Sequence, residues 1–295
     1  MLSKEFLSQL PIKNIKQATP VSGGLINFAY HLKTDLKDYF LLVQKNQKKS
    51  VYANEIESLK FFAKAHIPAP LVLSAGEIEE NAYLLISYIN SGSGKQSDVG
   101  KLLAKLHSFK SPNGKFGFKY PEMRNYNLHF DNSWTDSWIK LFVYRRLDVM
   151  KDSLLYLHLW KDEDKKLYLK IRPLIIGILN KHHSVPSLLH GDLWEANYMY
   201  LKDGTPAFID PNSTFGDREL DFGLICMSNR LSSNPEFSKG FYTAYQNAYP
   251  LDKGFSKRIE FYILYFLMIH LQKFGSFKYF SAVNSQMHRI LALDN

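Results

Sequence analysis

The chain lacks several features that would mark a specialised class of protein. Its 295 residues include one cysteine, Cys226, which excludes an internal disulfide framework and a cysteine-rich metal site. A single cysteine also fits a reducing compartment. The sequence has no internal repeat and no low-complexity tract. With 45% hydrophobic residues, it can form one or two domains with a sizeable core. We therefore expect an ordinary globular protein.

Long apolar runs are missing as well. The most apolar stretch, 259–271, is interrupted by Glu260 and His270 and is shorter than the roughly 18 residues that a membrane-spanning helix needs. Residues 1–20 mix charged with apolar side chains and lack the continuous apolar core of a signal peptide. These patterns predict a soluble, cytoplasmic protein that does not bind membranes.

Acidic residues are fewer than basic ones. The chain has 28 Asp and Glu against 37 Lys and Arg, which gives a formal net charge of +9. Such a balance suits anionic partners such as nucleotides. It would also suit nucleic acid, but the basic residues are scattered and the aromatic residues lie among aliphatic ones at core-like spacing. We therefore expect no nucleic-acid partner.

The most informative stretch contains a predicted β-hairpin. Two short apolar, aromatic-rich runs flank Lys-Asp-Gly-Thr at 202–205, and Asp-Gly between such runs is a hairpin signal. If Leu201 faces Pro206, antiparallel pairing also sets Asn197 opposite Asp210, with roughly 4.5 to 5.5 Å between their Cα atoms. An amide oxygen beside a carboxylate suits Mg²⁺, which prefers hard oxygen ligands. The pattern therefore predicts a magnesium site at the open end of the hairpin.

Asp192 lies just upstream of this hairpin, in Leu-His-Gly-Asp-Leu-Trp-Glu-Ala-Asn. A carboxylate on such a loop can accept the proton of a substrate hydroxyl while a metal neutralises the transferred phosphoryl group. Asp-x4-Asn, followed by a hairpin and a further Asp, is the arrangement of the kinase catalytic loop. We therefore predict a phosphoryl-transfer site, with Asp192 as base or hydroxyl-positioning group and Asn197 and Asp210 as Mg²⁺ ligands.

This block resembles the fructosamine kinase (ketosamine-3-kinase) family. The resemblance rests on His-Gly-Asp-Leu-Trp-x-x-Asn at 190–197, Ile-Asp-Pro at 209–211 and Phe-Gly-Asp-Arg-Glu-Leu-Asp at 215–221, and it extends over most of the chain from about Val21. The family belongs to the aminoglycoside-phosphotransferase and choline-kinase group. The resemblance implies phosphorylation of a ketosamine hydroxyl by ATP, as in protein deglycation.

The resemblance also implies an α+β, protein-kinase-like fold with two lobes. Residues 1–90 would form a nucleotide-binding lobe with a small antiparallel sheet and a helix, and residues 91–295 a larger, mostly helical catalytic and acceptor-binding lobe. Apolar periodicity agrees with this division. It predicts strands at 39–43, 71–75 and 82–88, and helices at 2–10, 51–65, 99–107, 167–179, 237–245, 255–274 and 280–291.

Two parts of the implied nucleotide site lie in the first lobe. Gly23 and Gly24 would form the loop that covers the nucleotide, because glycines allow close approach of backbone to phosphate. Ser87, Tyr88 and Ile89 would belong to the hinge whose backbone recognises adenine.

A kinase-like fold also requires a lysine on the third strand and a glutamate on the helix that follows it. Glu55 matches the family's glutamate. Lys45 is the nearest candidate for the lysine. However, if Asn46 is aligned with the Val-Asn that follows the family's lysine, Gln44 or a neighbour falls on that position. Lys45 could equally belong to a solvated turn.

The acceptor side departs from the family. Asn125-Tyr126 match the start of the family's Asn-Tyr-Ile-Gly-Ser-Thr-Pro-Gln-like segment, but Asn-Leu-His-Phe-Asp at 127–131 replaces its Gly-Ser-Thr-Pro-Gln core. If this segment shapes the acceptor pocket, the acceptor could differ from a standard ketosamine. Trp194 is a candidate for stacking on a sugar face, or alternatively for bracing the loop. Trp134 and Trp138, at helical spacing, are predicted core residues.

Other interpretations stay open at this point. The acceptor could be an aminoglycoside, choline or another amino alcohol. Metal-dependent phosphate hydrolysis through His190 and Asp192 would need further His and Asp clusters that the chain does not offer at suitable spacing. The unassigned strand lysine allows a nucleotide-binding pseudokinase. Asp217 and Asp221 are expected to brace the catalytic loop. The expected partners are Mg-ATP and a small-molecule or glycated-amine acceptor, with the protein a monomer or a weak homodimer.

Overall fold

The computed structural model describes residues 2–21, 27–125 and 128–294. The chain forms two compact units. The first comprises Met1–Gly94 together with Met199–Ile209, and the second comprises Lys95–Tyr198 and Asp210–Asn295. The chain therefore leaves the first unit close to the predicted boundary after residue 90, but it returns to that unit once, which the sequence did not indicate.

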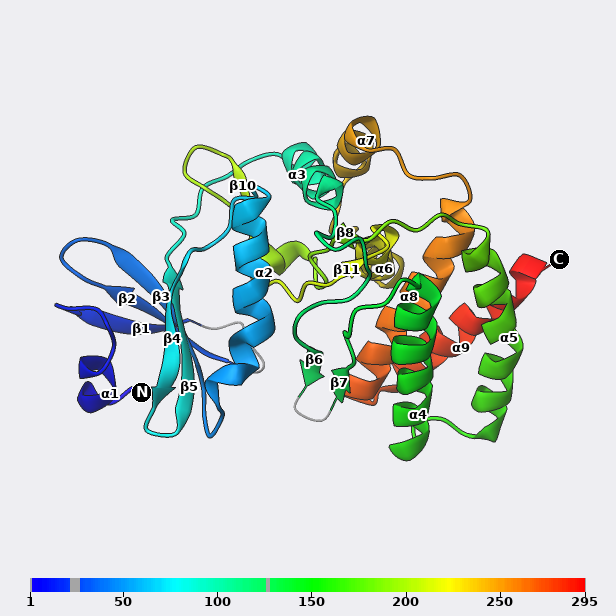
Figure 1. Cartoon of the computed structure of the whole chain (residues 1–295), viewed down its shortest axis with the longest axis horizontal. Helices are drawn as coiled ribbons and strands as arrows, with labels where there is room; N and C mark the ends of the chain where they lie inside the picture. Colours follow the sequence, from blue (N-terminus) through cyan, green and yellow to red (C-terminus); the bar gives the residue numbers. More distant parts are fainter. Residues whose placement is uncertain (1, 22–26, 126–127, 295) are drawn as a thin grey trace. The chain divides into compact units, whose positions relative to one another are not determined.

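The first unit contains a five-stranded antiparallel sheet in the order β1-β2-β3-β5-β4 (Figure 1). Its elements before the second unit are α1 (Lys4–Ser8), β1 (Gln17–Val21), β2 (Phe28–Lys33), β3 (Asp38–Gln44), the 3-10 helix η1 (Lys49–Tyr52), α2 (Ala53–Lys64), β4 (Val72–Ile78) and β5 (Asn81–Ser87).

Both faces of this sheet are covered. Successive side chains of a strand point to opposite faces, so Leu42 and Val43 of β3 face different surroundings. Val43 packs in a cluster with Phe6 of α1. Leu42 packs in a second cluster with Leu59 of α2. The sheet thus has an α1-facing side and an α2-facing side.

The returning segment forms a hairpin of β9 (Tyr198–Tyr200) and β10 (Pro206–Phe208). Backbone hydrogen bonds tie it to the rest of the first unit. The Gly92 amide donates to the Tyr200 carbonyl (2.7 Å), and the Phe208 amide donates to the Pro68 carbonyl (2.9 Å). The predicted hairpin is therefore present.

The register of this hairpin differs from the prediction. The Leu201 amide donates to the Thr205 carbonyl (2.8 Å), so Leu201 lies opposite Thr205; its predicted pairing with Pro206 is wrong by one residue. The cause is the turn, in which Gly204 adopts a left-handed conformation (φ +84°) and donates its amide to the Leu201 carbonyl (2.9 Å). A glycine in this conformation forms a bulge at the end of the turn, so the loop comprises residues 202–204 where the sequence predicted 202–205.

With an antiparallel sheet in the first unit and mostly helices in the second, the α+β fold class predicted from the sequence is confirmed. The second unit is mostly helical. Its elements are α3 (Gln96–Ser108), β6 (Glu122–Asn125), β7 (Leu128–Phe130), the π-helix η2 (Lys140–Leu147), α4 (Asp148–Tyr156), α5 (Asp162–Asn180), β8 (Ser187–Leu188), η3 (Glu195–Asn197), β11 (Phe215–Gly216), α6 (Glu219–Leu231), α7 (Lys239–Ala248), α8 (Phe255–Phe274), α9 (Phe277–Leu291) and η4 (Ala292–Asp294).

Helix α8 supplies much of the core of this unit. Tyr262 of α8 accepts a hydrogen bond from Trp138 Nε1 (3.0 Å), and the Trp138 ring stacks on Phe142 with 5.4 Å between centroids. Trp138 is buried, as predicted. Trp134 precedes the helix and is 36% exposed, so its predicted place in the core is wrong. In the part of the chain that the structure describes, no helix has the length and apolar character needed to cross a bilayer.

Candidate active site

The loop that carries Asp192 is held by a buried carboxylate of α6. Asp221 accepts the backbone amide of His190 at Oδ2 (2.7 Å) and that of Gly191 at Oδ1 (2.8 Å). Burial alone would raise the pKa of Asp221, but hydrogen bonds from His107 and the loop keep this pKa below its ordinary value. The carboxylate is therefore ionised, and it fixes the loop as the sequence predicted for Asp221.

A buried histidine supports Asp221 in turn. His107 Nε2 lies 3.0 Å from Asp221 Oδ2, and His107 Nδ1 lies 2.8 Å from the Tyr245 hydroxyl. An ionised carboxylate only accepts, so Nε2 carries the proton and Nδ1 accepts from Tyr245. Burial lowers the pKa of His107, which agrees with a neutral ring. The sequence did not reveal this role, because these partners lie more than 100 positions away from His107.

Gly191 brings this loop against the segment that follows Asp210. A Cβ atom at Gly191 would lie 1.8 Å from the Asn212 carbonyl oxygen, and Gly191 has a left-handed conformation (φ +81°). The Asn212 amide also donates to the His190 carbonyl (2.9 Å). A side chain cannot be placed at Gly191 without moving one of the two segments that carry predicted site residues.

Asn197 is oriented by its contact with Asp192. Its Nδ2 group donates to the Asp192 carbonyl (2.8 Å) and lies 3.3 Å from Asp192 Oδ2. Asn197 itself is buried, at 5% exposure. Because Nδ2 faces Asp192, the amide oxygen Oδ1 is left as the ligand atom of this side chain.

Asp210 is the third predicted catalytic or metal-binding residue of the second unit. It has a left-handed backbone (φ +50°), which is uncommon for a non-glycine residue. Surrounding protein atoms and the charge of Asp192 raise the pKa of Asp210 to about 6. The Asp210 side chain nonetheless reaches solvent, so the effect of burial on its pKa is weakened. Charge repulsion from Asp192 is therefore the more important cause of the raised pKa. A cation would relieve this repulsion, and the oxygen donors fit Mg²⁺.

Three further predicted residues lie in the first unit. Glu55 is in the first turn of α2. Lys45 lies in the turn after β3, is exposed, and has its ammonium group 4.9 Å from the centre of the Phe28 ring. Ser87 ends β5, and its amide donates to the Leu71 carbonyl (2.9 Å). Gly23 and Gly24 lie outside the described residues.

The other hinge residues follow directly on β5. Tyr88 stacks on the ring of His31, with 3.9 Å between centroids and an interplanar angle of 11°. His31 Nε2 is 2.7 Å from Asp38 Oδ2, so two residues of the neighbouring strands β2 and β3 help to fix the position of the Tyr88 ring. Ile89 comes next in the chain.

The predicted acceptor segment is partly described. Tyr126 and Asn127 lie outside the described residues, whereas Leu128–Phe130 form strand β7. The β6–β7 hairpin is anchored by a buried ion pair in which Arg146 donates to Glu122 Oε2 (2.8 Å). Trp194, in the loop that carries Asp192, is 39% exposed.

A second group of potential metal ligands is occupied by internal partners. Ligand atoms of His182, Asp217 and Glu219 lie within 4.8 Å of one another. However, both oxygens of Glu219 accept hydrogen bonds from Arg258 (2.7 and 2.6 Å). Asp217 Oδ2 lies 2.9 Å from His182 Nε2 and accepts from Ser184 Oγ (2.6 Å). We therefore interpret this group as structural.

The His182–Asp217 contact should make stability depend on pH. Burial alone would lower the pKa of His182, but Asp217 raises it above its ordinary value. A histidine with a raised folded-state pKa stabilises the fold fully below its unfolded pKa of about 6.5, and the contribution is lost as pH rises through the folded pKa. His182→Gln should therefore lower the melting temperature more at about pH 5.5 than at about pH 8.5. Exposed His183→Gln is the matched control, and an equal loss at both pH values would contradict the assignment.

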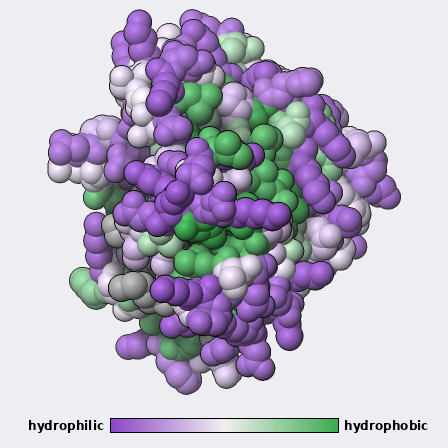
Figure 2. Space-filling view, turned by 90° about the vertical axis from the view of Figure 1, so that its left-hand side faces the viewer, coloured by the Kyte–Doolittle hydropathy of each residue, from purple (hydrophilic) through white to green (hydrophobic). Residues whose placement is uncertain are grey.

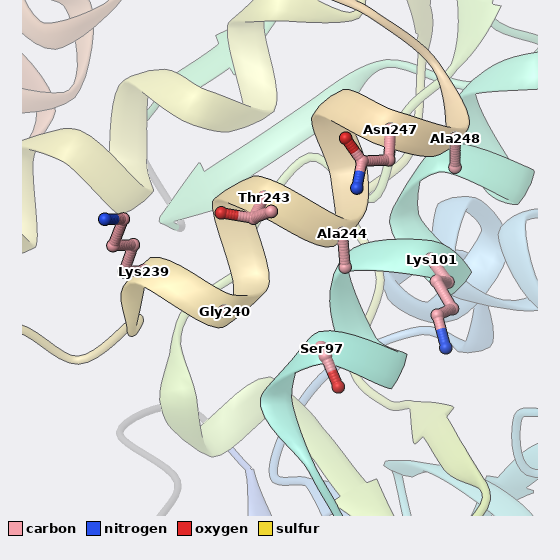
Figure 3. A pocket seen from close by; sticks show the side chains of 8 residues that line it. All are labelled: Ser97, Lys101, Lys239, Gly240, Thr243, Ala244, Asn247 and Ala248. Atoms are coloured by element: carbon pink, nitrogen blue, oxygen red, sulfur yellow. The ribbon is translucent and has the colours of Figure 1, made fainter.

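Two surface features carry no functional assignment. A hollow of about 690 Å³ is lined by α3 and α7, and Figure 3 shows Lys101 and Lys239 at its opposite ends. Its lining residues, all within the described part of the second unit, include none of the predicted site residues. The face drawn in Figure 2 has apolar atoms gathered between hydrophilic ones. Folded proteins ordinarily expose apolar surface, so this face identifies no partner.

Comparison with known proteins decides the family. A family model described as fructosamine kinase matches residues 2–293. The chain belongs to the fructosamine kinase family. It is 47% identical over 291 residues to a probable ketoamine kinase of Staphylococcus aureus, covering 98% of both chains. It is 30% identical to the chloroplastic protein-ribulosamine 3-kinase of Arabidopsis thaliana, covering 87% of this chain and 77% of that protein.

Solved structures agree with this assignment. The crystal structure of a protein assigned as a fructosamine-3-kinase, from Haemophilus somnus 129PT, has a TM-score of 0.79 and 26% identity, covering 94% of this chain and 92% of that one. The aminoglycoside phosphotransferase APH(4)-Ia has a TM-score of 0.68 at 14% identity, covering 99% of both chains, and shows a shared fold. The predicted family and the predicted protein-kinase-like fold are both confirmed.

Proposed function

We propose that this fructosamine kinase family member transfers the γ-phosphoryl group of ATP to a hydroxyl of a ketosamine. The observation that carries the proposal is that Asp192 and Asn197 lie on a loop fixed by Asp221, and that Asp210, on a separate segment, is near enough to Asp192 for its pKa to be raised by that charge. A carboxylate that can take a proton and two oxygen ligands for a cation are the parts that phosphoryl transfer requires. The names of the sequence relatives supply the acceptor class.

In this proposal, Asp192 positions the acceptor hydroxyl and takes its proton. The Asp192 carboxylate is held near Asn197 Nδ2, and its own backbone carbonyl is bonded to the same group, so the side chain has few ways to turn. A hydroxyl held at this carboxylate is oriented for attack, which is how much of a kinase's rate enhancement arises.

Asn197 Oδ1 and the Asp210 carboxylate would hold Mg²⁺. When bound, the metal supplies charge neutralisation for the phosphate oxygens. The two protein ligands differ in charge, and with Asp192 nearby the site carries a net negative charge that attracts a divalent cation.

The nucleotide would be held by the first unit. We assign Gly23 and Gly24 to the loop that covers the phosphates, and the backbone of Ser87, Tyr88 and Ile89 to adenine recognition. Glu55 would serve as the helix glutamate of the kinase-like arrangement. Tyr88, fixed by His31, gives this hinge a defined position within the unit.

The acceptor would be recognised in the second unit. Trp194 is exposed two positions after Asp192 in the same loop, and an indole face is well suited to pack against the apolar face of a sugar. The 127–131 segment differs from the family pattern, so we assign it to fine specificity among ketosamines.

The test is Mg-ATP turnover by the purified protein on a panel of fructosamines, ribulosamines, aminoglycosides and choline. ADP release is measured for each acceptor, and the phosphorylated product is identified by mass spectrometry. Turnover on a ketosamine, with kcat/KM at least about tenfold above that on the other classes, supports the proposal. Turnover confined to aminoglycosides or choline would remove the ketosamine as substrate while retaining the kinase chemistry.

A further inference from the structure

Three neutral polar side chains meet at the end of β3. Gln44 Nε2 donates to Asn27 Oδ1 (2.8 Å), and the Tyr52 hydroxyl donates to the same oxygen (3.0 Å). Gln44 is 7% exposed and Tyr52 is 1% exposed, so both donors are buried. We call Asn27, Gln44 and Tyr52 the amide cluster. It is assembled from β3, the residue before β2, and the 3-10 helix before α2.

The amide cluster lies on the α2-facing side of the sheet. Gln44 follows Leu42 by two positions, so both side chains point to the side that packs against α2. Lys45 lies over Phe28, which pairs with Val43 on the α1-facing side. The neutral Gln44 therefore faces α2, and the cation Lys45 does not.

This placement reverses what a kinase-like sheet is expected to show. Such folds place a lysine on β3 to hold the nucleotide phosphates, paired with a glutamate of the helix that packs on the sheet. Here an amide occupies the strand position that faces the helix. A lysine buried as deeply as Gln44 would carry a large desolvation cost unless a carboxylate compensated it. The cluster supplies polar groups at this position without that cost.

The hydrogen bonds also define which atom the cluster can offer. Asn27 Oδ1 accepts from two donors, so the oxygen is saturated and points into the cluster. The Nδ2 group then points out of the cluster with two N–H donors. Amide donors of this kind bind phosphate oxygens without carrying charge.

We propose that Asn27 is a phosphate-binding residue of the nucleotide site, oriented by Gln44 and Tyr52, in place of a strand lysine. Asn27 contributes through Nδ2, whereas Gln44 and Tyr52 are positioning residues. The inference rests on the proposed function, because it assumes that the ligand is a nucleotide.

The decisive variant is Asn27→Asp. Aspartate has nearly the same shape and still accepts from Gln44 and Tyr52, so the cluster is retained. It replaces the outward donor with an anion that repels phosphate. We expect the Kd for Mg-ADP, measured by calorimetry, to rise at least about tenfold while the Kd for adenosine stays within about twofold. Gln44→Met, which has a similar length but no amide, should raise the Mg-ADP Kd by a smaller factor.

Lys45→Met is the matched control, and it should leave the Mg-ADP Kd within about twofold of wild type. If Asn27→Asp keeps its melting temperature and binds Mg-ADP as wild type does, the inference is overturned. An equal loss of adenosine and Mg-ADP binding would also overturn it, since that pattern indicates structural damage. So would a selective loss of Mg-ADP binding in Lys45→Met.

The two proposals can fail separately. A wild-type protein that binds Mg-ADP through Asn27 but phosphorylates no ketosamine would refute the proposed acceptor and support the phosphate contact. If the wild-type protein phosphorylates a ketosamine but Asn27→Asp binds Mg-ADP as tightly as wild type, the proposed acceptor is supported and the phosphate contact of Asn27 is refuted.

Discussion

Asp192→Asn should lower kcat by about 10²- to 10⁴-fold. Asparagine has almost the same size and shape but cannot take a proton from the acceptor hydroxyl. The backbone contacts of the loop, including the bond from Asn197 to the carbonyl of residue 192, do not depend on the carboxylate. Removing the Asp192 carboxylate also removes the charge repulsion that raises the pKa of Asp210. The melting temperature should therefore stay within a few degrees of wild type.

Steady-state ADP release with a saturating ketosamine measures this effect. Glu195→Gln is the matched control, since it removes an exposed carboxylate three positions along the same loop. It should retain activity within about twofold. If Asp192→Asn retains more than about a tenth of wild-type kcat, the assignment of Asp192 as base or positioning group is wrong.

Asp221→Ala should cause the largest loss of stability among the substitutions considered, about 3 to 5 kcal/mol in the free energy of unfolding. The substitution leaves the amides of His190 and Gly191 and the Nε2 proton of His107 without their shared acceptor in the protein interior. Each unsatisfied buried donor costs about 1 to 3 kcal/mol. Activity should fall as well, because the loop that carries Asp192 loses its anchor.

Urea denaturation of wild type and Asp221→Ala, monitored by tryptophan fluorescence and circular dichroism, measures the predicted loss in the free energy of unfolding. Asp221→Asn is the informative comparison. Its amide oxygen can still accept one backbone amide, so its loss should be clearly smaller than that of alanine. Equal denaturation midpoints for wild type and Asp221→Ala would show that the anchor contributes little.

Local sequence patterns were sufficient for much of the fold. The hairpin followed from Asp-Gly between two apolar runs, and the Asp192-x4-Asn197 spacing predicted a loop of the kinase type without reference to any family. The register did not follow, because Asp-Gly is compatible with more than one loop length and the conformation of Gly204 decides among them. Similarly, Trp134 and Trp138 share a helical spacing, but the sequence did not show that the helix begins after Trp134.

Other features depend on contacts that are distant in sequence. His107 meets Tyr245 and Asp221 only in the folded chain, so no local pattern could assign its role. Lys45 and Gln44 are neighbours, and a shift of one residue at a strand end moves a side chain to the other face of the sheet. Strand ends are the least certain part of any sequence-based assignment. At the end of β3, an error of one residue decides whether the amide of Gln44 or the cation of Lys45 is placed on the side that faces α2.

The return of Met199–Ile209 to the first unit has a practical consequence for dissecting the protein. A fragment that stops at Gly94 would lack both β9 and β10, and it would leave the Gly92 amide and the Pro68 carbonyl without the partners they have in the full chain. Isolated expression of the first unit would therefore need the hairpin grafted back through a short linker. Limited proteolysis between the units should likewise release no intact N-terminal piece, because the polypeptide passes between them three times.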